Sequence, residues 1–261
     1  MPNLSSKFLQ RHNDSLTFVT VSKKWNSVME LNLTNCKKLK IPFLWIKHIE
    51  VRSDNIELVV SKNSDYFSIL ECKSSATYLE KFFFRSIEFL DYESWFLRID
   101  SDELLSQKSL SAIKGSILEL NSKYVYRIKR LWIKKQDDSF FYSNNAKSSQ
   151  EKSDFQYRLF YSRNVLLDSK IHSPGIVIKK FKNLNQDLAI IHLIWIIENL
   201  NERIEKIKSY EEILSNAGLS KLRYYLPEIF PEAIHDWTLL NPDDQLIVSE
   251  WLMLDSKNRL D

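Results

Sequence analysis

Two aspartates and a glutamate directly follow a short run of bulky apolar residues, and side chains of these types suit metal chemistry. Residues 95–99 have the composition of a buried strand, and Asp100, Asp102 and Glu103 stand at its end. In open α/β sheets, ligands bind outside the carboxyl ends of the strands. On an extended chain Asp100 and Asp102 point to the same side, so they can share one Mg²⁺ or Mn²⁺ ion. The same acids also suit a helix N-terminus, where the helix dipole favours negative charge.

The elements that must position these acids alternate between strand and helix. Hydrophobic patterns predict strands over residues 16–21, 56–60, 67–71, 95–100, 124–130, 156–160 and 176–181. They predict helices over residues 26–39, 74–90, 109–120 and 195–217, and leave residues 41–51 open. This alternation predicts an α/β fold, with a mostly parallel central sheet flanked by helices.

The C-terminal part of the chain is expected to be helical. An apolar run ends at His192 and leads into the long predicted helix, for which Gly218 is a candidate C-cap. Prolines break the last 40 residues into short predicted helices. We therefore predict one catalytic domain over residues 1–217 and a helical extension over residues 218–261 that packs on it. The polar residues 137–154 predict a loop, which is a candidate lid.

Composition narrows the class of protein. Aromatic residues make up 13% of the 261 residues, which favours a sizeable core. A formal net charge of +3, with acids and bases well mixed, favours no nucleic-acid partner. Three glycines leave no glycine-rich phosphate loop, so other groups must hold any nucleotide. Cys36 and Cys72 show no metal or disulfide spacing, and no apolar run is long enough for a transmembrane segment. We expect a soluble, cytoplasmic protein, and the Lys, Asn, Ser and Ile bias is typical of a bacterium or a phage-infected host cell.

Four ordered segments resemble family-2 glycosyltransferases with the GT-A fold. Residues 93–103 are similar to the family's apolar strand that ends in a DxDE motif. Residues 153–160 resemble its D-x-Q-x-R-L-F segment, and residues 171–173 stand where many relatives have His-Glu. The fourth segment is Ile191-His192, which Arg203, Lys206 and Tyr210 follow in the predicted helix.

The resemblance implies a hexosyltransferase that moves a sugar from a nucleotide donor to a hydroxyl of a carbohydrate or another acceptor, with inversion at the anomeric carbon. UDP-hexose is the commonest donor of such enzymes. A nucleoside diphosphate leaves more readily when a cation meets its developing charge, so Mn²⁺ or Mg²⁺ is implied as the cofactor. In this interpretation Asp102 and His192 bind the metal ion, and Asp100 lies near the ribose or a metal-bound water.

Inverting transfer also needs a base beside the acceptor hydroxyl. The resemblance makes Asp154 the candidate base, with Arg158 as the residue that clamps the diphosphate or orients Asp154. Glu103 is the alternative acid. His172 is a secondary candidate on the acceptor side, although Ser173 replaces the acidic neighbour that is usual in the family.

The nucleotide is expected where the first two predicted strands end. Thr20 and Ser22 end the first strand, and Asp65 ends the loop after the second, where it can accept a hydrogen bond from uracil. Lys81 and Arg85, on the predicted helix before the acids, are expected to approach the base or the phosphates. The usual Asp-Asp-x-Ser-x-Asp loop is replaced by residues 61–65, so the identity of the donor stays open.

Two other classes of function stay open. Asp54, Glu71 and Lys73 flank the strand predicted over residues 56–60 in the D…ExK manner of Mg²⁺-dependent nucleases. In a nuclease the two acids would bind the metal ion and Lys73 would stabilise phosphate. The modest net charge and the lack of a basic arm argue against this hypothesis. The third class is a non-catalytic binding protein with a GT-A-like fold.

Overall fold

The described part of the chain folds into two compact units. The computed structural model describes residues 16–52, 56–75, 83, 86, 94–143, 154–162, 166–167, 176–185, 187–213, 215–216, 218–219, 222–230 and 237–258. Unit 1 contains the described residues within Met1–Ser101, Ser106–Ile128 and Tyr157–Asn185. Unit 2 contains those within Asp102–Leu105, Lys129–Gln156 and Gln186–Asp261. The predicted domain boundary after residue 217 stays a prediction, and the residues on both sides of it belong to unit 2.

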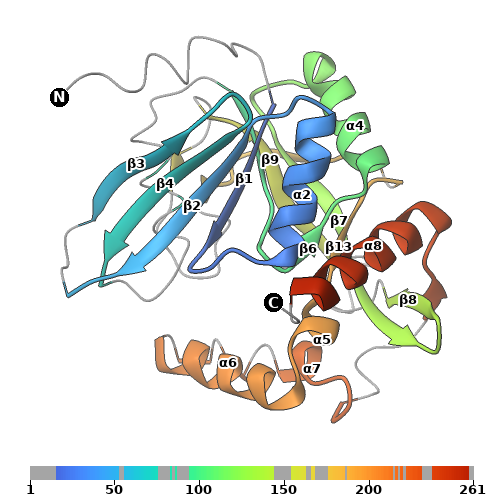
Figure 1. Ribbon diagram of the computed structural model, residues 1–261. Coiled ribbons are helices and arrows are strands. Elements are labelled where there is room, and N and C mark those ends of the chain that lie inside the picture. Colours follow the sequence, from blue (N-terminus) through green and yellow to red (C-terminus); the bar gives the residue numbers. More distant parts are fainter. Residues whose placement is uncertain are drawn as a thin grey trace. The chain divides into compact units, whose positions relative to one another are not determined.

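Unit 1 is built on four parallel strands. They are β1 (Leu16–Ser22), β2 (Phe43–Glu50), β4 (Phe67–Ser74) and β5 (Trp95–Arg98), and they lie in the order β4-β2-β1-β5. Numbered along the chain, the parallel strands therefore have the order 3-2-1-4 (Figure 1). The antiparallel strand β3 (Glu57–Asn63) pairs with β4, and β9 (Asp154–Tyr161) pairs antiparallel with β5. The predicted α/β class with a mostly parallel central sheet and flanking helices is confirmed.

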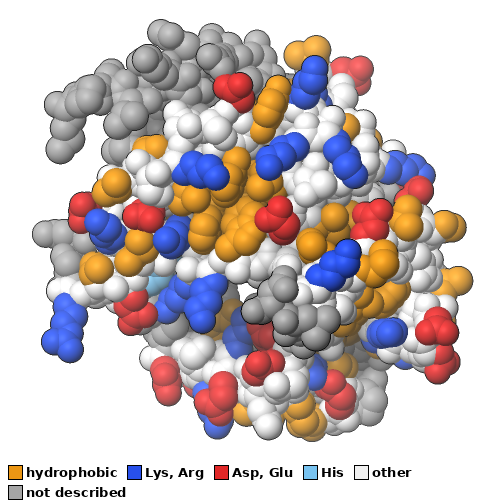
Figure 2. Space-filling model, viewed as in Figure 1, with side chains coloured by type: hydrophobic (Ala, Val, Ile, Leu, Met, Phe, Trp, Pro, Cys, Tyr) orange, Lys and Arg blue, Asp and Glu red, His pale blue; other side chains and the backbone are white. Residues whose placement is uncertain are grey.

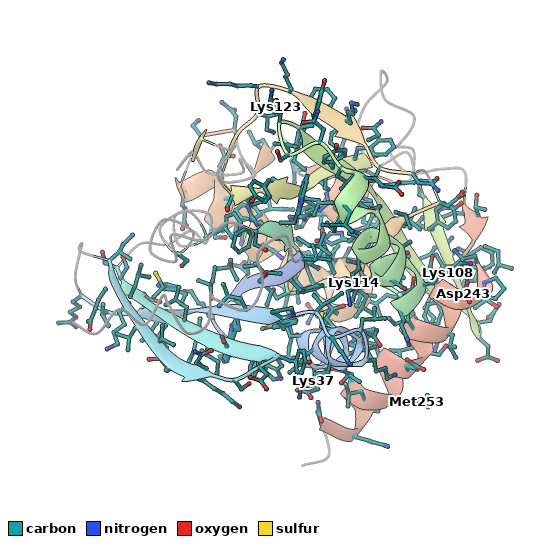
Figure 3. All side chains as sticks on the ribbon, turned by 90° about the horizontal axis from the view of Figure 1, so that it is seen from above. Lys37, Lys108, Lys114, Lys123, Asp243 and Met253 are labelled. Atoms are coloured by element: carbon teal, nitrogen blue, oxygen red, sulfur yellow. The ribbon has the colours of Figure 1, made fainter. Side chains whose placement is uncertain are left out.

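Helix α2 (Ser27–Lys38) covers one face of this sheet (Figure 1). Asn26 caps its N-terminus, because the Asn26 side chain accepts a hydrogen bond from Met29 N at 2.9 Å. The 3₁₀ turn η1 (Ile117–Glu119) follows helix α4 (Gln107–Ser116), which lies beside α2. Lys114 of α4 donates to Leu39 O, and Figure 3 labels Lys114 and Lys37 on these two neighbouring helices.

The core of unit 1 fills both faces of the sheet, since every residue of β1 is buried. Val19, Val21 and Phe83 belong to one core cluster, and on the other face of β1 the Ser22 hydroxyl contacts Met29 of α2. On the α2 side, the ring of Trp25 lies 5.2 Å from those of Trp45 and Phe67. Figure 2 shows hydrophobic side chains gathered over β1 and β2, beside α2.

The described part of unit 2 contains three short strands and a hairpin. Its part of β7 (Val125–Gln136) pairs in parallel with β13 (Ala189–His192), which pairs antiparallel with β6 (Glu103–Leu104). Strand β8 (Ser139–Ser143) forms a hairpin with β7, and β14 (Thr238–Leu239) pairs with β8.

The remaining elements are mostly helices of unit 2. These helices are α5 (Ile194–Ile197), α6 (Leu200–Ile213), α7 (Leu222–Tyr225) and α8 (Pro242–Asn258). None of the helices among the described residues is long and apolar enough to cross a membrane. In unit 1, β12 (Phe181–Asn183) pairs with the start of β7, and β10 (Leu166–Leu167) pairs with β11 (Ile176–Val177).

Several predicted elements differ from the structure. The sequence left the secondary structure of residues 41–51 undecided, and they contain β2. Glu103 lies in strand β6 and not at a helix N-terminus. The predicted loop over residues 137–154 is wrong at its start, because residues 139–143 form β8. A two-residue turn with Asp137 at φ 53° joins β7 to β8. The predicted helix over residues 74–90 lies outside the described residues except for Phe83 and Ser86.

The long helix predicted over residues 195–217 is split into α5 and α6. The Asn199 side chain accepts from Glu202 N, and the Glu202 carboxylate accepts from Asn199 N, so a reciprocal cap starts α6. At the other end, Asn216 and not Gly218 has the left-handed conformation, with φ 66°. Gly218 is needed there for another reason, because a Cβ atom at this position would collide with the backbone oxygen of Ile207. The predicted all-helical extension also contains the strand β14.

Both cysteines are buried, and we predict that neither reacts in the folded protein. Cys36 and Cys72 are free thiols with no solvent exposure. Burial raises the pKa of Cys72 to about 12 and raises the pKa of Cys36 well above its usual range. Since the thiolate is the nucleophile, iodoacetamide at pH 8 should modify neither residue, and both should react in urea. Mass spectrometry checks this, and rapid alkylation of either cysteine under native conditions would contradict it.

Candidate functional site

Asp102 and His192, far apart in the chain, lie together in unit 2 because β6 pairs with β13. The register places Glu103 opposite His192, and Leu193 N donates to Asp102 O at 2.9 Å. Asp102 Oδ2 consequently lies 3.4 Å from His192 Nε2. The structure therefore brings together the two residues that the resemblance names as metal ligands.

The His192 ring is held in an aromatic setting. It stands edge-on to Trp132, with ring centroids 4.2 Å apart, and Trp132 in turn contacts Trp195. His192 is 4% exposed, and its buried Nδ1 atom has no hydrogen-bond partner among the described residues. The packing fixes the ring plane, so Nε2 is directed at Asp102 by sterics and not by a hydrogen bond at Nδ1.

Lys206 brings a second basic side chain to Asp102. Its Nζ atom lies 3.7 Å from Asp102 Oδ2 and 2.9 Å from Glu198 Oε1. Burial raises the pKa of Asp102, but His192, Lys206 and Arg130 outweigh that effect, so the pKa lies below its usual range. Burial lowers the pKa of Lys206, but Asp102 and the nearby tyrosines and Glu198 outweigh it and raise the pKa. Asp102 and Lys206 are therefore both charged at neutral pH.

A buried ion-pair network in unit 2 holds Asp154 and Glu103. Arg130 Nε donates to Asp154 Oδ2 at 2.8 Å, and Arg130 NH1 lies 3.4 Å from Glu103 Oε1. Trp132 Nε1 donates to the same Asp154 oxygen, and Gln156 Nε2 donates to Oδ1 at 2.6 Å. Asp154 is 2% exposed and Glu103 is fully buried. A base must reach the acceptor hydroxyl, so for either acid a catalytic role requires a change in these contacts.

In unit 1 Asp100 lies beside two buried arginines. Asp100 Oδ2 is 2.5 Å from Arg158 NH2, and Oδ1 is 3.6 Å from Arg98 NH2. Arg98 packs on the ring of Phe83, and its Nε and NH1 atoms have no hydrogen-bond partner among the described residues. The antiparallel register pairs Leu97 with Leu159, so one step further Arg98 and Arg158 stand opposite each other on β5 and β9.

The assumption that the chain is extended from Asp100 to Asp102 is wrong. Strand β5 ends at Arg98, and the chain turns at Ser101 and Asp102 before β6 begins. The i, i+2 rule for strands does not apply across a turn. Each aspartate has its own basic partners, which are arginines for Asp100 and His192 with Lys206 for Asp102.

The residues predicted to hold the nucleotide are not all at one edge of unit 1. Thr20 and Ser22 are buried near the carboxyl end of β1, and the Ser22 hydroxyl accepts from Trp45 Nε1 at 2.9 Å. Asp65 is exposed in the turn before β4. Because β1, β2, β4 and β5 are parallel, this turn lies at the amino edge of the sheet, whereas Ser22 and Asp100 lie at the carboxyl edge. Asp65 is therefore separated from Ser22 by the length of a strand, which is roughly 20 Å.

Several candidates lie outside the described residues, namely Lys81, Arg85, His172 and Asp54. The other two residues of the nuclease hypothesis are described. Glu71 pairs with Lys47 on the adjacent strand at 3.3 Å, and Lys73 pairs with Glu57 at 3.7 Å. These are ordinary cross-strand ion pairs of a sheet surface.

Three residues of these clusters were not singled out in the sequence, namely Arg98, Arg130 and Glu198, and Lys206 was named only as part of the resemblance, without a role. The sequence carries a signal for two of them. Arg130 falls on the buried side of an alternating strand, on which Tyr126 and Ile128 are apolar and buried. Lys206 lies one helical turn after Arg203 and one turn before Tyr210, which is the spacing of a single helix face. Arg98 is a charged residue within an apolar run, and Glu198 has no such signal.

The pair Asp102–His192 fits a divalent cation as two adjacent ligands. Metal–ligand bonds of about 2.1 Å place neighbouring ligand atoms roughly 3 Å apart, close to the 3.4 Å between Oδ2 and Nε2. No group of three or more His, Cys, Asp or Glu side chains is placed to hold a metal ion in the part of the chain that the structure describes. Water and a substrate oxygen would have to complete the shell, as is usual for Mg²⁺.

The fold and these clusters define an α/β protein with a mixed sheet, whose core strands are mostly parallel, and buried acid–base pairs at strand ends. A comparison with models of protein families gives no match. A comparison with curated proteins gives no match either.

Proposed function

We propose that this protein is a metal-dependent glycosyltransferase of GT-A type, which transfers a hexose from a nucleotide-sugar donor to an acceptor hydroxyl with inversion. The observation that carries the proposal is the contact between Asp102 Oδ2 and His192 Nε2 at 3.4 Å. The resemblance names these two residues independently, in segments far apart in the chain. Strand pairing between β6 and β13 then supports a joint role in holding Mn²⁺ or Mg²⁺.

The strand order of unit 1 supports a nucleotide site at its carboxyl edge. In a 3-2-1-4 order, strands 1 and 4 are neighbours whose connections leave in opposite directions, and ligands bind outside their carboxyl ends. These strands are β1, which ends at Ser22, and β5, which ends two residues before Asp100. Arg158 and Arg98 flank Asp100, and guanidinium groups bind phosphate oxygens well. In the proposal Asp100 orients the ribose and Arg158 clamps the diphosphate.

In the proposed sugar transfer, the cation and Asp154 have separate roles. When bound, the divalent cation would meet the negative charge that develops on the diphosphate as the sugar leaves. Asp102 and His192 hold that cation from the protein side. Asp154 is the proposed base, and it reaches the acceptor hydroxyl after its hydrogen bond from Arg130, Trp132 or Gln156 is released. UDP-hexose is the first donor to test.

Titration calorimetry with UDP, GDP and CDP, each with and without Mn²⁺, tests the proposal. One nucleotide is expected to bind at least about tenfold more tightly with Mn²⁺ than without it, which corresponds to about 1.4 kcal/mol. That nucleotide then defines the donor for a transfer assay. If the folded protein binds none of the three, the glycosyltransferase proposal fails. No specific observation favours the nuclease alternative, since Glu71 and Lys73 are both engaged in ion pairs across the sheet.

A further inference from the structure

We infer that Lys206 is a resident counter-cation of Asp102, which a divalent metal ion must displace, so that the metal ion binds tightly only together with an anionic diphosphate. The inference rests on the proposed function and deepens it, because it states how metal ion and donor depend on each other. Lys206 acts in it through Asp102 and the ligand, and is a positioning residue.

The ammonium group of Lys206 lies among negative groups. Asp102 Oδ2 is 3.7 Å from Nζ and Glu198 Oε1 is 2.9 Å from it. On another side Nζ lies 5.7 Å from the centre of the Tyr225 ring, whose face attracts cations. The Lys206 side chain is 27% exposed, so water screens this charge only in part. These groups form a place for one positive charge, and Lys206 fills it.

The backbone of Lys206 is firmly held. The reciprocal cap between Asn199 and Glu202 starts α6 at Leu200, nearly two turns before Lys206. Arg203 then anchors the helix, because it donates to Tyr225 O at 2.7 Å and pairs with the Glu228 carboxylate. The Cα atom of Lys206 therefore stays in place, while the four-carbon stem lets the ammonium group move by several ångströms.

A metal ion on Asp102 and the ammonium group compete for the same oxygen. An ion bonded to Asp102 Oδ2 at about 2.2 Å lies less than roughly 6 Å from Nζ if Lys206 keeps its position. That separation is shorter than the Debye length of about 8 Å at physiological ionic strength, so salt screens the repulsion only in part. Metal binding to the protein alone is therefore opposed by the charge of Lys206.

A diphosphate removes this opposition. It offers oxygens to the metal ion and, at the same time, new acceptors to the ammonium group when it leaves Asp102. Each of the two ligands then improves the binding of the other by the same factor, as linkage requires. The structure thus couples metal ion and donor through one lysine.

Replacing Lys206 by Met tests the inference with MnCl₂ alone. Lys206→Met keeps the apolar stem and removes the charge, so the variant is expected to bind Mn²⁺ at least about tenfold more tightly than the wild type without nucleotide. The free Mn²⁺ signal in electron paramagnetic resonance measures this affinity. A second titration contains UDP and is corrected for Mn²⁺–UDP association in buffer. The factor by which UDP increases the affinity for Mn²⁺ should shrink towards one in the variant.

Two matched variants separate charge from structure. Lys208→Met removes the same charge from the same helix, at an exposed residue that pairs with Glu205, and should leave Mn²⁺ affinity unchanged. Lys206→Arg keeps the charge and should keep the weak affinity of the wild type. A tenfold gain in either variant would overturn the inference, because the effect would not then depend on the charge of Lys206.

Unchanged or weaker Mn²⁺ binding by folded Lys206→Met also overturns it, and if that variant does not fold, Lys206→Gln decides by the same criterion. The result is independent of the donor. If no nucleotide binds but Lys206→Met gains Mn²⁺ affinity, the glycosyltransferase proposal fails and the counter-cation role stands. If a nucleotide binds with Mn²⁺ and Lys206→Met gains nothing, only the counter-cation role fails.

Discussion

Replacing Asp102 by Asn is expected to abolish Mn²⁺-dependent nucleotide binding and to lower sugar transfer by about 100-fold or more. Asp102 supplies the only carboxylate of the proposed metal pair, and the neutral amide of Asn does not replace its charge. His192 Nε2, 3.4 Å away, then has no anionic partner with which to hold the cation. Calorimetry with the nucleotide that the wild type binds, followed by a transfer assay, measures both effects.

Asp138→Asn is the matched control for Asp102→Asn. Asp138 lies exposed in the turn between β7 and β8, so the same change of charge there should leave binding and transfer intact. Full Mn²⁺-dependent binding by Asp102→Asn would exclude Asp102 as a metal ligand.

The difference in stability between the wild type and Asp102→Asn should depend on pH. Because the fold lowers the pKa of Asp102, the ionised carboxylate stabilises the folded protein at neutral pH. That contribution is lost only as the pH falls below about 4 and through the lowered pKa. The wild type should therefore be more stable than the variant at pH 7, and the difference should narrow in strong acid. Urea unfolding at several pH values measures it.

Replacing Asp154 by Ala is expected to lower the free energy of unfolding by about 3–5 kcal/mol. Asp154 is 2% exposed and accepts hydrogen bonds from Arg130, Trp132 and Gln156. Its removal takes from the buried guanidinium group of Arg130 its 2.8 Å ion pair and leaves the longer 3.4 Å contact to Glu103. It also leaves the indole N–H of Trp132 without its acceptor. Urea unfolding of the wild type and the variant checks this expectation.

A double-mutant cycle shows whether the loss comes from the unpaired charge. In Asp154→Ala with Arg130→Met the guanidinium group is gone, so the double variant should be more stable than Asp154→Ala alone. Equal losses in the single and the double variant would mean that Arg130 is not the cause.

Asp154→Asn tests the proposed catalytic role of Asp154, because the amide still accepts hydrogen bonds but takes up no proton. If Asp154 is the base, this variant binds the donor and transfers no sugar, whereas unchanged transfer rules the role out.

The local structure around the acids was largely predictable. Residues 16–21, 95–100 and 156–160 were predicted as strands, and they lie in or next to β1, β5 and β9. Residues 109–120 were predicted as a helix and contain most of α4. These predictions succeed because each element has its own period of apolar residues, which neighbours in the chain determine.

The predictions were wrong where a helix cap or a turn interrupts the periodic pattern of apolar residues. The apolar pattern continues from Trp195 into α6, but Asn199 and Glu202 form a cap that ends one helix and begins another. The chain after Ile99 turns at Ser101, so Asp100 and Asp102 do not follow the geometry of a strand. Turns and caps depend on one or two polar residues, which a pattern of apolar residues does not register.

The sequence by itself determined the α/β class, the position of the acids after a buried strand, and a set of candidate residues that includes Asp102, His192, Asp100 and Arg158. Only the tertiary structure decided how these residues are paired. The β6–β13 register brings His192 to Asp102, Arg130 joins Glu103 to Asp154, and Lys206 comes to Asp102 from α6. The physical reason is that a buried charge needs an opposite charge, but the sequence offers many of both signs, and the pairing of distant strands and helices selects among them.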